Sequence, residues 1–354
     1  MKKQIGQFLH RQFRKNEIAI HELNYLFWEC TLRCNLNCLH CGSDCKRTSA
    51  VEDMPFDHFL QAILPLNKVY KPGTTMVVIT GGEPLMRSDL PECGLKLREH
   101  GFRWGIVTNG FAYNKENHLK LLNAGMGAIT LSIDGIEETH NRLRGNPDSY
   151  SYALRALDLI TSSPQLNYDV VTCVHQKNID ELEALKNLLI KHKTNAWRLF
   201  TIAPIGRAAH NPLLQLSNSQ LRQMMDFIVK TRKEGIIDAK FSCEAFTGKY
   251  ETLVRDSFFF CRAGINIGSV LIDGSISACP NINSSFIQGS IYKDNLVDVW
   301  ENRFQEMRNR SWTQKGICKN CTDFKNCNGG ALHLWDEKRN GILQCHKCHL
   351  EDFS

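Results

Sequence analysis

Short apolar and β-branched runs alternate with helix-periodic stretches between residues 24 and 202. Strands are predicted over 24–30, 75–80, 103–108, 128–133, 169–174 and 196–202. The segments between them repeat apolar residues every three to four positions, as helices that cover a sheet do. Strands that alternate with helices run parallel and are joined by right-handed crossovers. Six units in a row therefore predict an α/β fold, a partial (β/α)6 barrel that falls short of the eight units of a closed barrel.

This pattern stops at about residue 209. Residues 210–240 predict a helical linker, and the segment that follows is rich in cysteine and poor in strands. Asp273-Gly274 within GSVLIDGSISACP predicts a β-hairpin. Because its apolar content is too low for an independent core, this part is expected to be a small α+β domain whose fold is stabilised by bound metal. The predicted division is a basic helical extension (1–23), the partial barrel (24–209), the linker (210–240) and the cysteine-rich domain (241–354).

Composition and charge narrow the class of protein only a little. The hydrophobic fraction of 42% and the charged fraction of 23% are those of a globular protein. No apolar run is long enough for a membrane span and the N-terminus lacks the apolar core of a signal peptide, so a cytoplasmic protein is expected. The net charge of +6 comes without aromatic–basic interleaving, so no nucleic-acid partner is expected.

The N-terminal extension carries a cluster of basic residues. Its members are Lys2, Lys3, Arg11, Arg14 and Lys15. A helix face that leaves these side chains in water explains them without any partner, and we adopt that interpretation. Contact with an acidic partner or with a membrane surface is the alternative.

Cysteine usage changes the picture more than charge does. The chain has 15 cysteines, although disulfides are rare in cytosolic proteins. Their odd number and their grouping at 30–45, 261–279 and 318–348 indicate metal binding rather than disulfide pairing. Cys93 and Cys173 stand alone and are predicted to be ordinary core residues.

Motifs whose residues could bind a ligand or take part in a reaction follow the predicted strands. The first cysteine group comes after the first strand, GGEP (81–84) after the second, TNG (108–110) after the third and SIDG (132–135) after the fourth. APIGR (203–207) follows the sixth strand. In parallel α/β sheets the functional site lies at the carboxyl ends of the strands. The motifs are therefore expected to converge on one face of the sheet.

Three cysteines of the first group have the spacing C-x3-C-x2-C. Thiolates from a short loop hold iron–sulfur clusters, and Cys34, Cys38 and Cys41 would leave one iron of a four-iron cluster without a protein ligand. An open coordination position is typical of a catalytic metal site. The alternative is a structural zinc site with Cys30 or Cys45 as the fourth ligand. Otherwise Cys30 and Cys45 are expected to take no part.

With these motifs the chain resembles the radical S-adenosylmethionine (SAM) superfamily, over the whole α/β region. The C-x3-C-x2-C loop, with His40 before the third cysteine, is similar to the motif that defines the family. The resemblance implies a [4Fe–4S] cluster on Cys34, Cys38 and Cys41 whose open iron chelates SAM. It also implies a 5′-deoxyadenosyl radical that takes a hydrogen atom from the substrate, and electrons from a low-potential donor such as flavodoxin or ferredoxin.

The same resemblance implies a set of SAM-binding residues. They are Gly81, Gly82, Glu83, Pro84, Asn109, Ser132, Asp134 and Arg144. In this interpretation GGEP binds the amino group of SAM, with Glu83 as the ion-pair partner, and Arg144 binds the carboxylate. Ser132 and Asp134 point the same way from a strand end and are expected to bind ribose or carboxylate. The alternatives are a β-turn ended by proline for GGEP and a plain turn residue for Asn109.

The later cysteines resemble the SPASM extension, an auxiliary-cluster domain of many radical SAM enzymes. The resemblance implies one or two auxiliary [4Fe–4S] clusters. The candidate ligands are Cys261, Cys279, Cys318, Cys321, Cys327, Cys345 and Cys348, with Cys243 as a further candidate. The family pattern C-x2-C-x5-C-x3-C has a cysteine where this chain has Ala331, so the number of clusters stays open. A zinc ribbon is the alternative, and CHKCH (345–349) matches a haem-attachment motif that we interpret as coincidence.

Taken together, the resemblance predicts an enzyme that modifies a peptide or protein side chain. The first alternative is oxidation or decarboxylation of a small molecule such as a haem precursor. The second is a non-catalytic iron–sulfur or zinc-binding protein, which would have no use for the predicted SAM-binding residues. No membrane span is expected in any of these cases.

Overall fold

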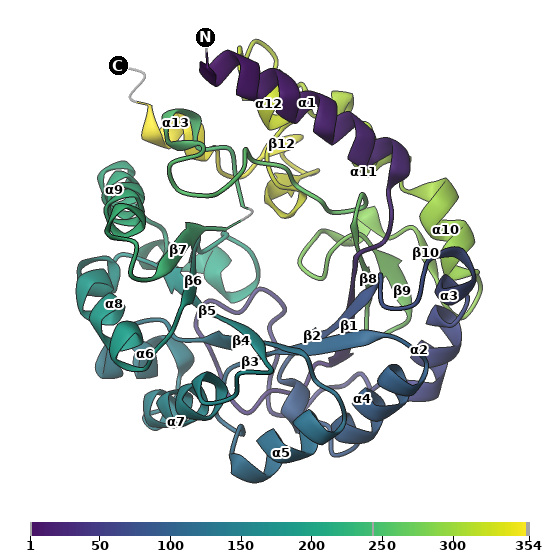
Figure 1. The fold of residues 1–354 in the computed structure, drawn as a ribbon. Coiled ribbons are helices and arrows are strands. Elements are labelled where there is room, and N and C mark those ends of the chain that lie inside the picture. The colour runs from purple at the N-terminus through teal and green to yellow at the C-terminus, as the bar shows by residue number, and fades with distance from the viewer. Residues whose placement is uncertain (1, 243, 352–354) are drawn as a thin grey trace.

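The computed structural model describes residues 2–242 and 244–351. A curved sheet forms its centre, and helices cover the outer side of the sheet (Figure 1). Its parallel strands are β1 (Tyr25–Thr31), β2 (Met76–Gly81), β3 (Arg103–Thr108), β4 (Ala128–Ser132), β5 (Asn167–Val174), β6 (Ala196–Thr201) and β7 (Asp238–Phe241). The strands lie side by side in chain order, so the predicted α/β partial barrel is confirmed.

Helices occupy the connections between these strands, as the apolar periodicity predicts. They are α2 (Phe56–Ile63), α3 (Leu66–Val69), α4 (Leu90–Glu99), α5 (Lys115–Asn123), α6 (Glu137–Arg144), α7 (Ser149–Thr161), α8 (Leu182–Lys191) and α9 (Asn218–Glu234). The 3-10 helices are η1 (Pro84–Met86), η2 (Ile179–Glu181), η3 (Gly206–His210), η4 (Pro212–Leu214), η5 (Gly248–Tyr250), η6 (Ser284–Phe286), η7 (Ser311–Thr313), η8 (Gly316–Cys318) and η9 (Leu332–Leu334).

The sheet extends one parallel strand beyond the six that the sequence predicts. β7 pairs with β6, and α9 connects the two strands as the helix of a further unit. Only Ala239 and Phe241 of β7 are buried, so this four-residue strand lacks the apolar run that marks the others. Residues 210–240 thus contain the last crossover helix of the sheet.

Side chains along β1 point alternately to the two faces of the sheet. Leu26, Trp28 and Cys30 are buried against the covering helices, and the Trp28 ring stacks on Phe59 of α2 at a centroid distance of 4.6 Å. Cys30 therefore belongs to the hydrophobic core, where Cys93 also lies. This agrees with the predicted core role of Cys93 and places Cys30 away from the loop that follows.

The C-terminal segment continues the barrel sheet instead of standing apart from it. It contains β8 (Ile267–Val270), β9 (Ser275–Ser277), β10 (Gly289–Ser290), β11 (Trp335–Asp336), β12 (Gly341–Ile342), α10 (Leu296–Arg303), α11 (Gln305–Arg308), α12 (Phe324–Cys327) and α13 (His346–Leu350). The predicted hairpin around Asp273-Gly274 is present, and its first strand pairs in parallel with β1. The small α+β domain is thus joined to the barrel through β8, which uses the free edge of β1.

The N-terminal helix α1 (Lys2–Ile20) lies along the outer rim of the molecule, beside the C-terminal segment (Figure 1). Arg14 is buried there and donates to the carbonyl oxygens of Lys325 at 2.6 Å and Asn326 at 3.0 Å. The prediction that Arg14 belongs to a solvated face was wrong, because its guanidinium group satisfies carbonyl groups around α12. Among the residues that the structure describes, no helix is long and apolar enough to cross a membrane.

Candidate active site

The first cysteine group forms a compact loop directly after β1. Cys34 and Cys38 are buried and Cys41 is half-buried, and the three side chains pack in one cluster with Leu36 and Phe111. All three thiols are free of disulfides. Reduced thiols gathered at the carboxyl end of a strand are the donor set that an iron–sulfur cluster needs.

Neighbouring segments hold this loop through its backbone. The Cys34 amide donates to the Lys46 carbonyl at 2.7 Å, and the Leu39 amide donates to the Leu143 carbonyl at 2.8 Å. From η3, the Arg207 amide donates to the Cys41 carbonyl at 3.0 Å. The APIGR motif, which the sequence left without a role, therefore fixes the far end of the cysteine loop.

The glycines of GGEP allow β2 to approach the cysteine loop. The Gly82 amide donates to the Thr31 carbonyl at 2.7 Å, and a Cβ atom at Gly82 would lie 2.2 Å from the Arg33 carbonyl oxygen. Gly81 has a φ angle of +125°, which other residues rarely adopt. The sequence suggested a close approach to a ligand, and the structure shows a close approach to the loop that carries the thiols.

Glu83 lies beneath the loop in an almost fully buried position. Its Oε1 accepts from Thr108 Oγ1 at 2.8 Å and from the Leu85 amide at 3.2 Å, and its Oε2 accepts from the Asn109 amide at 2.8 Å. Burial raises the pKa of Glu83 to about 7, against the lowering effect of these hydrogen bonds. A carboxylate has about four acceptor positions, so a cation could still bind here and would favour the ionised form.

Asn109 links this carboxylate to the cysteine loop. Its Nδ2 atom donates to Asn35 Oδ1 at 2.8 Å and lies 3.8 Å from Cys34 Sγ. Its own Oδ1 accepts from the Phe111 amide at 2.9 Å. Asn109 therefore contacts one of the three thiols, a contact that a plain turn residue would not need.

Arg144, at the end of α6, connects the loop to a buried carboxylate. Its Nη1 lies 3.7 Å from Cys38 Sγ, and its Nε donates to Asp134 Oδ2 at 2.6 Å. Asp134 Oδ1 accepts from the Cys173 amide at 2.8 Å, so both oxygens of Asp134 are used. Burial acts to raise the pKa of Asp134, but the Arg144 charge outweighs it and the pKa is lowered. The pair is ionised and keeps a cation beside Cys38.

His40 and Cys173 complete this side of the site. Burial lowers the pKa of His40 to about 3, so its ring is neutral, and its Nδ1 has no hydrogen-bond partner in the described part of the chain. Ligand atoms of His40, Asp134 and Cys173 lie within 4.8 Å of one another. The prediction that Cys173 is an ordinary core residue was wrong, because it is half-buried at the carboxyl end of β5 beside these groups. Ser132 ends β4 and is buried two residues before Asp134.

Cys45 is closer to the site than its position in the sequence suggested. It is buried in the same cluster as the three thiols, and its amide lies 3.4 Å from Cys41 Sγ. The Cys45 thiol donates to the Ser43 carbonyl at 3.9 Å. Hydrogen bonding from Cys45 lowers the pKa of Cys41. Cys45 therefore contacts one of the three thiols through its backbone and is not a bystander. No periodicity or spacing signal could have shown this, because the loop folds back through non-local contacts.

A second group of thiols gathers near α12 and α13. Cys318 and Cys321 both influence the pKa of Cys327, which burial raises to about 12. Burial raises the pKa of Cys345 and of Cys318, and the neighbouring Cys348 adds to both shifts. Five predicted ligands of the C-terminal segment are thus close enough to affect one another, and they supply the four ligands of a cluster with one to spare.

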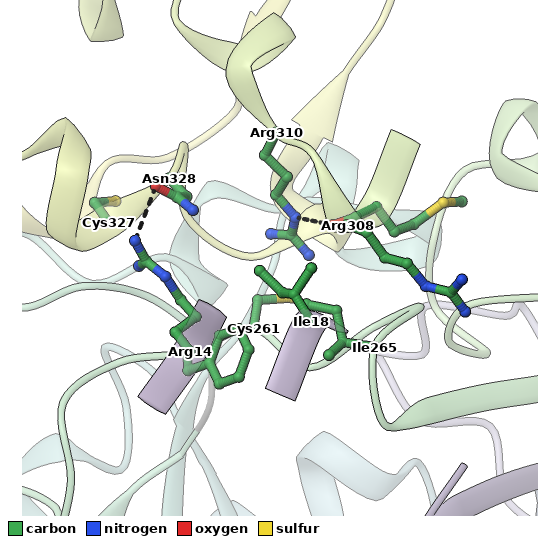
Figure 2. A pocket seen from close by; sticks show the side chains of 10 residues that line it. Arg14, Ile18, Cys261, Ile265, Arg308, Arg310, Cys327 and Asn328 are labelled. Carbon is green, nitrogen blue, oxygen red and sulfur yellow. Dashed lines mark hydrogen bonds between the residues drawn. The ribbon is translucent and has the colours of Figure 1, made fainter. Parts of the chain in front are cut away.

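Cys261 lies in a small cavity under α1 that Cys327 also lines (Figure 2). Burial acts to raise the pKa of Cys261, but the neighbouring guanidinium group of Arg310 lowers it. The cavity volume is about 10 Å³, which holds roughly one water molecule and no four-iron cluster. Ala331 is buried there against Phe246 and Phe259. Cys279 is half-buried beside the main core, and Cys243 lies outside the described residues.

Comparisons with known proteins agree with this arrangement. The radical SAM superfamily model matches residues 28–189, and an iron–sulfur cluster-binding domain model, SPASM, matches residues 261–322. The Fe-coproporphyrin III synthase of Methanosarcina barkeri is 27% identical over 90% of this chain and 84% of its own. The mycofactocin maturase MftC of Mycolicibacterium smegmatis is 27% identical over 87% of this chain and 77% of its own.

Solved structures show the same fold. SuiB of Streptococcus suis bound to S-adenosylmethionine has a TM-score of 0.66 at 17% identity and covers 88% of this chain and 73% of its own. The anSMEcpe protein with bound AdoMet has a TM-score of 0.72 at 18% identity and covers 93% of this chain and 94% of its own. At these identities the likeness concerns the architecture.

Proposed function

Because the chain belongs to the radical SAM superfamily and carries a SPASM domain, we propose that it is an enzyme that modifies a peptide or protein side chain. With its [4Fe–4S] cluster and SAM bound, the cofactor pair supplies a 5′-deoxyadenosyl radical that abstracts hydrogen. The observation that carries the proposal is the meeting of three free thiols with a buried carboxylate and a buried guanidinium group at one sheet edge.

The thiols of Cys34, Cys38 and Cys41 hold the cluster that binds SAM. Asn109 and Arg144 lie beside Cys34 and Cys38, where N–H groups stabilise negative charge on sulfur. The Cys45 amide does the same for Cys41. Cys45 acts as a donor and not as a fourth ligand, because a closed set of four thiolates would leave no position for SAM.

Glu83 and Arg144 bind the two charged ends of the amino-acid part of SAM. Glu83 has room for one more hydrogen-bond donor, which suits an ammonium group, and Arg144 has its Nη1 directed to the thiol side. Asp134 holds Arg144 through a buried ion pair, and each of its two oxygens already accepts a hydrogen bond from the protein. We therefore assign Asp134 to positioning Arg144, while Gly81 and Gly82 position the loop.

The C-terminal thiols hold one auxiliary cluster. Cys318, Cys321 and Cys327 are three of its ligands, and Cys345 or Cys348 is the fourth. We propose no second cluster at Cys261, because Ala331 stands where the family pattern has a further cysteine and Arg310 already balances charge on the Cys261 thiol. A low-potential donor such as flavodoxin or ferredoxin supplies the electrons.

A peptide or protein substrate is supported by the similarity to the mycofactocin maturase over 87% of the chain. A haem precursor is the second candidate, since the Fe-coproporphyrin III synthase is equally similar over 90% of the chain. Incubation of the reduced holoenzyme and SAM with Fe-coproporphyrin III, and separately with peptides encoded beside its gene, distinguishes the two by mass spectrometry. A mass change in a peptide supports the proposal, and a change only in the porphyrin overturns it.

A further inference from the structure

Helix α1 is attached to the rest of the protein mainly by polar side chains, although Ile18 lines the cavity beneath it. Arg14 binds the carbonyl groups of Lys325 and Asn326, and Glu17 forms a 2.9 Å ion pair with Arg262. Arg11 donates to Asn326 Oδ1 at 3.0 Å. A surface helix ordinarily docks by its apolar side and leaves its charges in water, so the orientation of α1 is inverted.

The apolar side of α1 consequently faces outward. Its large side chains are Ile5, Phe8, Leu9, Phe13 and Ile20, which are between 43% and 66% exposed. Positions 5, 8, 9 and 13 follow the spacing of one helix face. These five account for almost a third of the 17 large apolar side chains exposed among the described residues, although α1 is only 19 residues long. Such a concentration marks an interaction surface.

Charge narrows the kind of partner that this surface fits. The sequence of α1 contains a single acidic residue, Glu17, whose carboxylate is neutralised by Arg262. Among its basic residues Arg11 and Arg14 bind the protein, whereas Lys15 is exposed on the border of the apolar face. Exposed phenylalanine, leucine and isoleucine bordered by a lysine and by no unpaired carboxylate suit the headgroup region of anionic membranes.

Area and shape argue against a second copy of the chain as the occupant. A helix of 19 residues is about 28 Å long, and a stripe about 10 Å wide on it covers roughly 300 Å². Stable protein interfaces bury about 800 Å² on each partner. A convex ridge of this size leaves a rigid partner poorly packed, whereas lipid chains adapt to its shape.

We propose that α1 binds the protein peripherally to an anionic lipid bilayer, with Ile5, Phe8 and Leu9 inserted among the headgroups. The helix lies flat on the outer rim of the molecule, so docking leaves the barrel on the aqueous side (Figure 1). This attachment is independent of the proposed chemistry, since none of the residues that hold the cofactors belongs to α1.

Flotation of the anaerobically purified holoenzyme with vesicles tests the proposal. We expect the wild type to float with vesicles of phosphatidylcholine and phosphatidylglycerol, and to float much less with phosphatidylcholine alone. The double variant Phe8→Glu/Leu9→Glu should lose at least about tenfold in the bound fraction, because each substitution replaces an inserted apolar group by an anion. The matched control Ile236→Glu/Ile317→Glu changes two equally exposed side chains elsewhere and should bind like the wild type.

Iron content and circular dichroism of the double variant show whether the fold is kept, and light scattering reports the oligomeric state. The proposal is overturned if the wild type does not float with anionic vesicles or if the double variant floats as well as the control. It is also overturned if the wild type is a dimer that the double variant converts to a monomer, because a second copy would then cover α1.

Discussion

Arg144 stands between Asp134, with which it forms a fully buried ion pair, and Cys38, whose sulfur it approaches to 3.7 Å. Glu83 occupies a similarly buried place, with no fixed cation within hydrogen-bond distance among the described residues. One buried charge is therefore balanced in the free protein, and the other is free to be balanced by a ligand. We therefore expect the Arg144–Asp134 pair and Glu83 to affect the stability of the folded protein in different ways.

Substitution of Asp134 by asparagine should destabilise the protein. The change leaves the Arg144 charge buried without its partner, which costs about 3–5 kcal/mol of unfolding free energy. Denaturant unfolding of the cluster-free protein measures it. Glu116→Gln, which breaks the exposed pair with Lys120, is the control and should be close to neutral. Equal stability of the two variants would contradict the role given to Asp134.

Glu83 should make stability depend on pH in the opposite sense to an ordinary carboxylate. Its pKa is raised in the folded state from 4.5 to about 7, so the folded protein holds a proton that the unfolded chain releases. The stabilisation is therefore complete below pH 4.5 and is lost as pH rises toward 7, by up to about 3 kcal/mol. Glu83→Gln should flatten this part of the stability profile of the cluster-free protein. A profile that keeps its slope would refute the shift.

Elements differ in how much of them the sequence could predict. The six longer parallel strands and the convergence of GGEP, TNG and SIDG follow from periodicity and from strand ends. β7 is too short and too polar to produce a pattern. The pairing of β8 with β1 joins segments about 240 residues apart, and the burial of Cys45 beside the three thiols depends on how its loop folds. Neither local propensity nor cysteine spacing predicts these contacts.

The close approach of β2 to the cysteine loop gives a test at the level of elements. Gly82→Ala should displace the loop, because its Cβ would lie 2.2 Å from the Arg33 carbonyl oxygen. We expect the reconstituted variant to lose about four iron atoms per chain, measured by iron analysis. Gly127→Ala is the matched control, since its nearest neighbour would be 3.9 Å away. Full iron content in Gly82→Ala would show that the loop tolerates the shift.

The C-terminal cysteines make a separate prediction about the number of clusters. One cluster on Cys34, Cys38 and Cys41 and one on the thiols near α12 and α13 give about eight iron atoms per chain after anaerobic reconstitution. Cys318→Ser should remove about four of them, and Cys261→Ser should remove none, because Cys261 lies beside the Arg310 guanidinium group and is not among the proposed ligands. About twelve iron atoms in the wild type, falling to eight in Cys261→Ser, would mean that a second auxiliary cluster forms.

One ten-stranded sheet joins the barrel to the C-terminal segment, which also holds the two-stranded sheet β11–β12. The hairpin β8–β9 joins the C-terminal segment to β1, the strand that leads into the first cysteine loop. α1 fastens the same segment from outside. β8 and α1 thereby fix the C-terminal segment relative to the barrel, as the proposed pair of clusters would need for an electron to pass between them.

Production of 5′-deoxyadenosine from SAM by the dithionite-reduced, reconstituted protein tests the central claim most directly. The account predicts production by the wild type, none by Cys34→Ala, Cys38→Ala or Cys41→Ala, and largely retained production by Cys30→Ala and Cys45→Ala. No product from the wild type at full iron content, or loss of product in Cys45→Ala equal to that in Cys41→Ala, would contradict the three-thiol site.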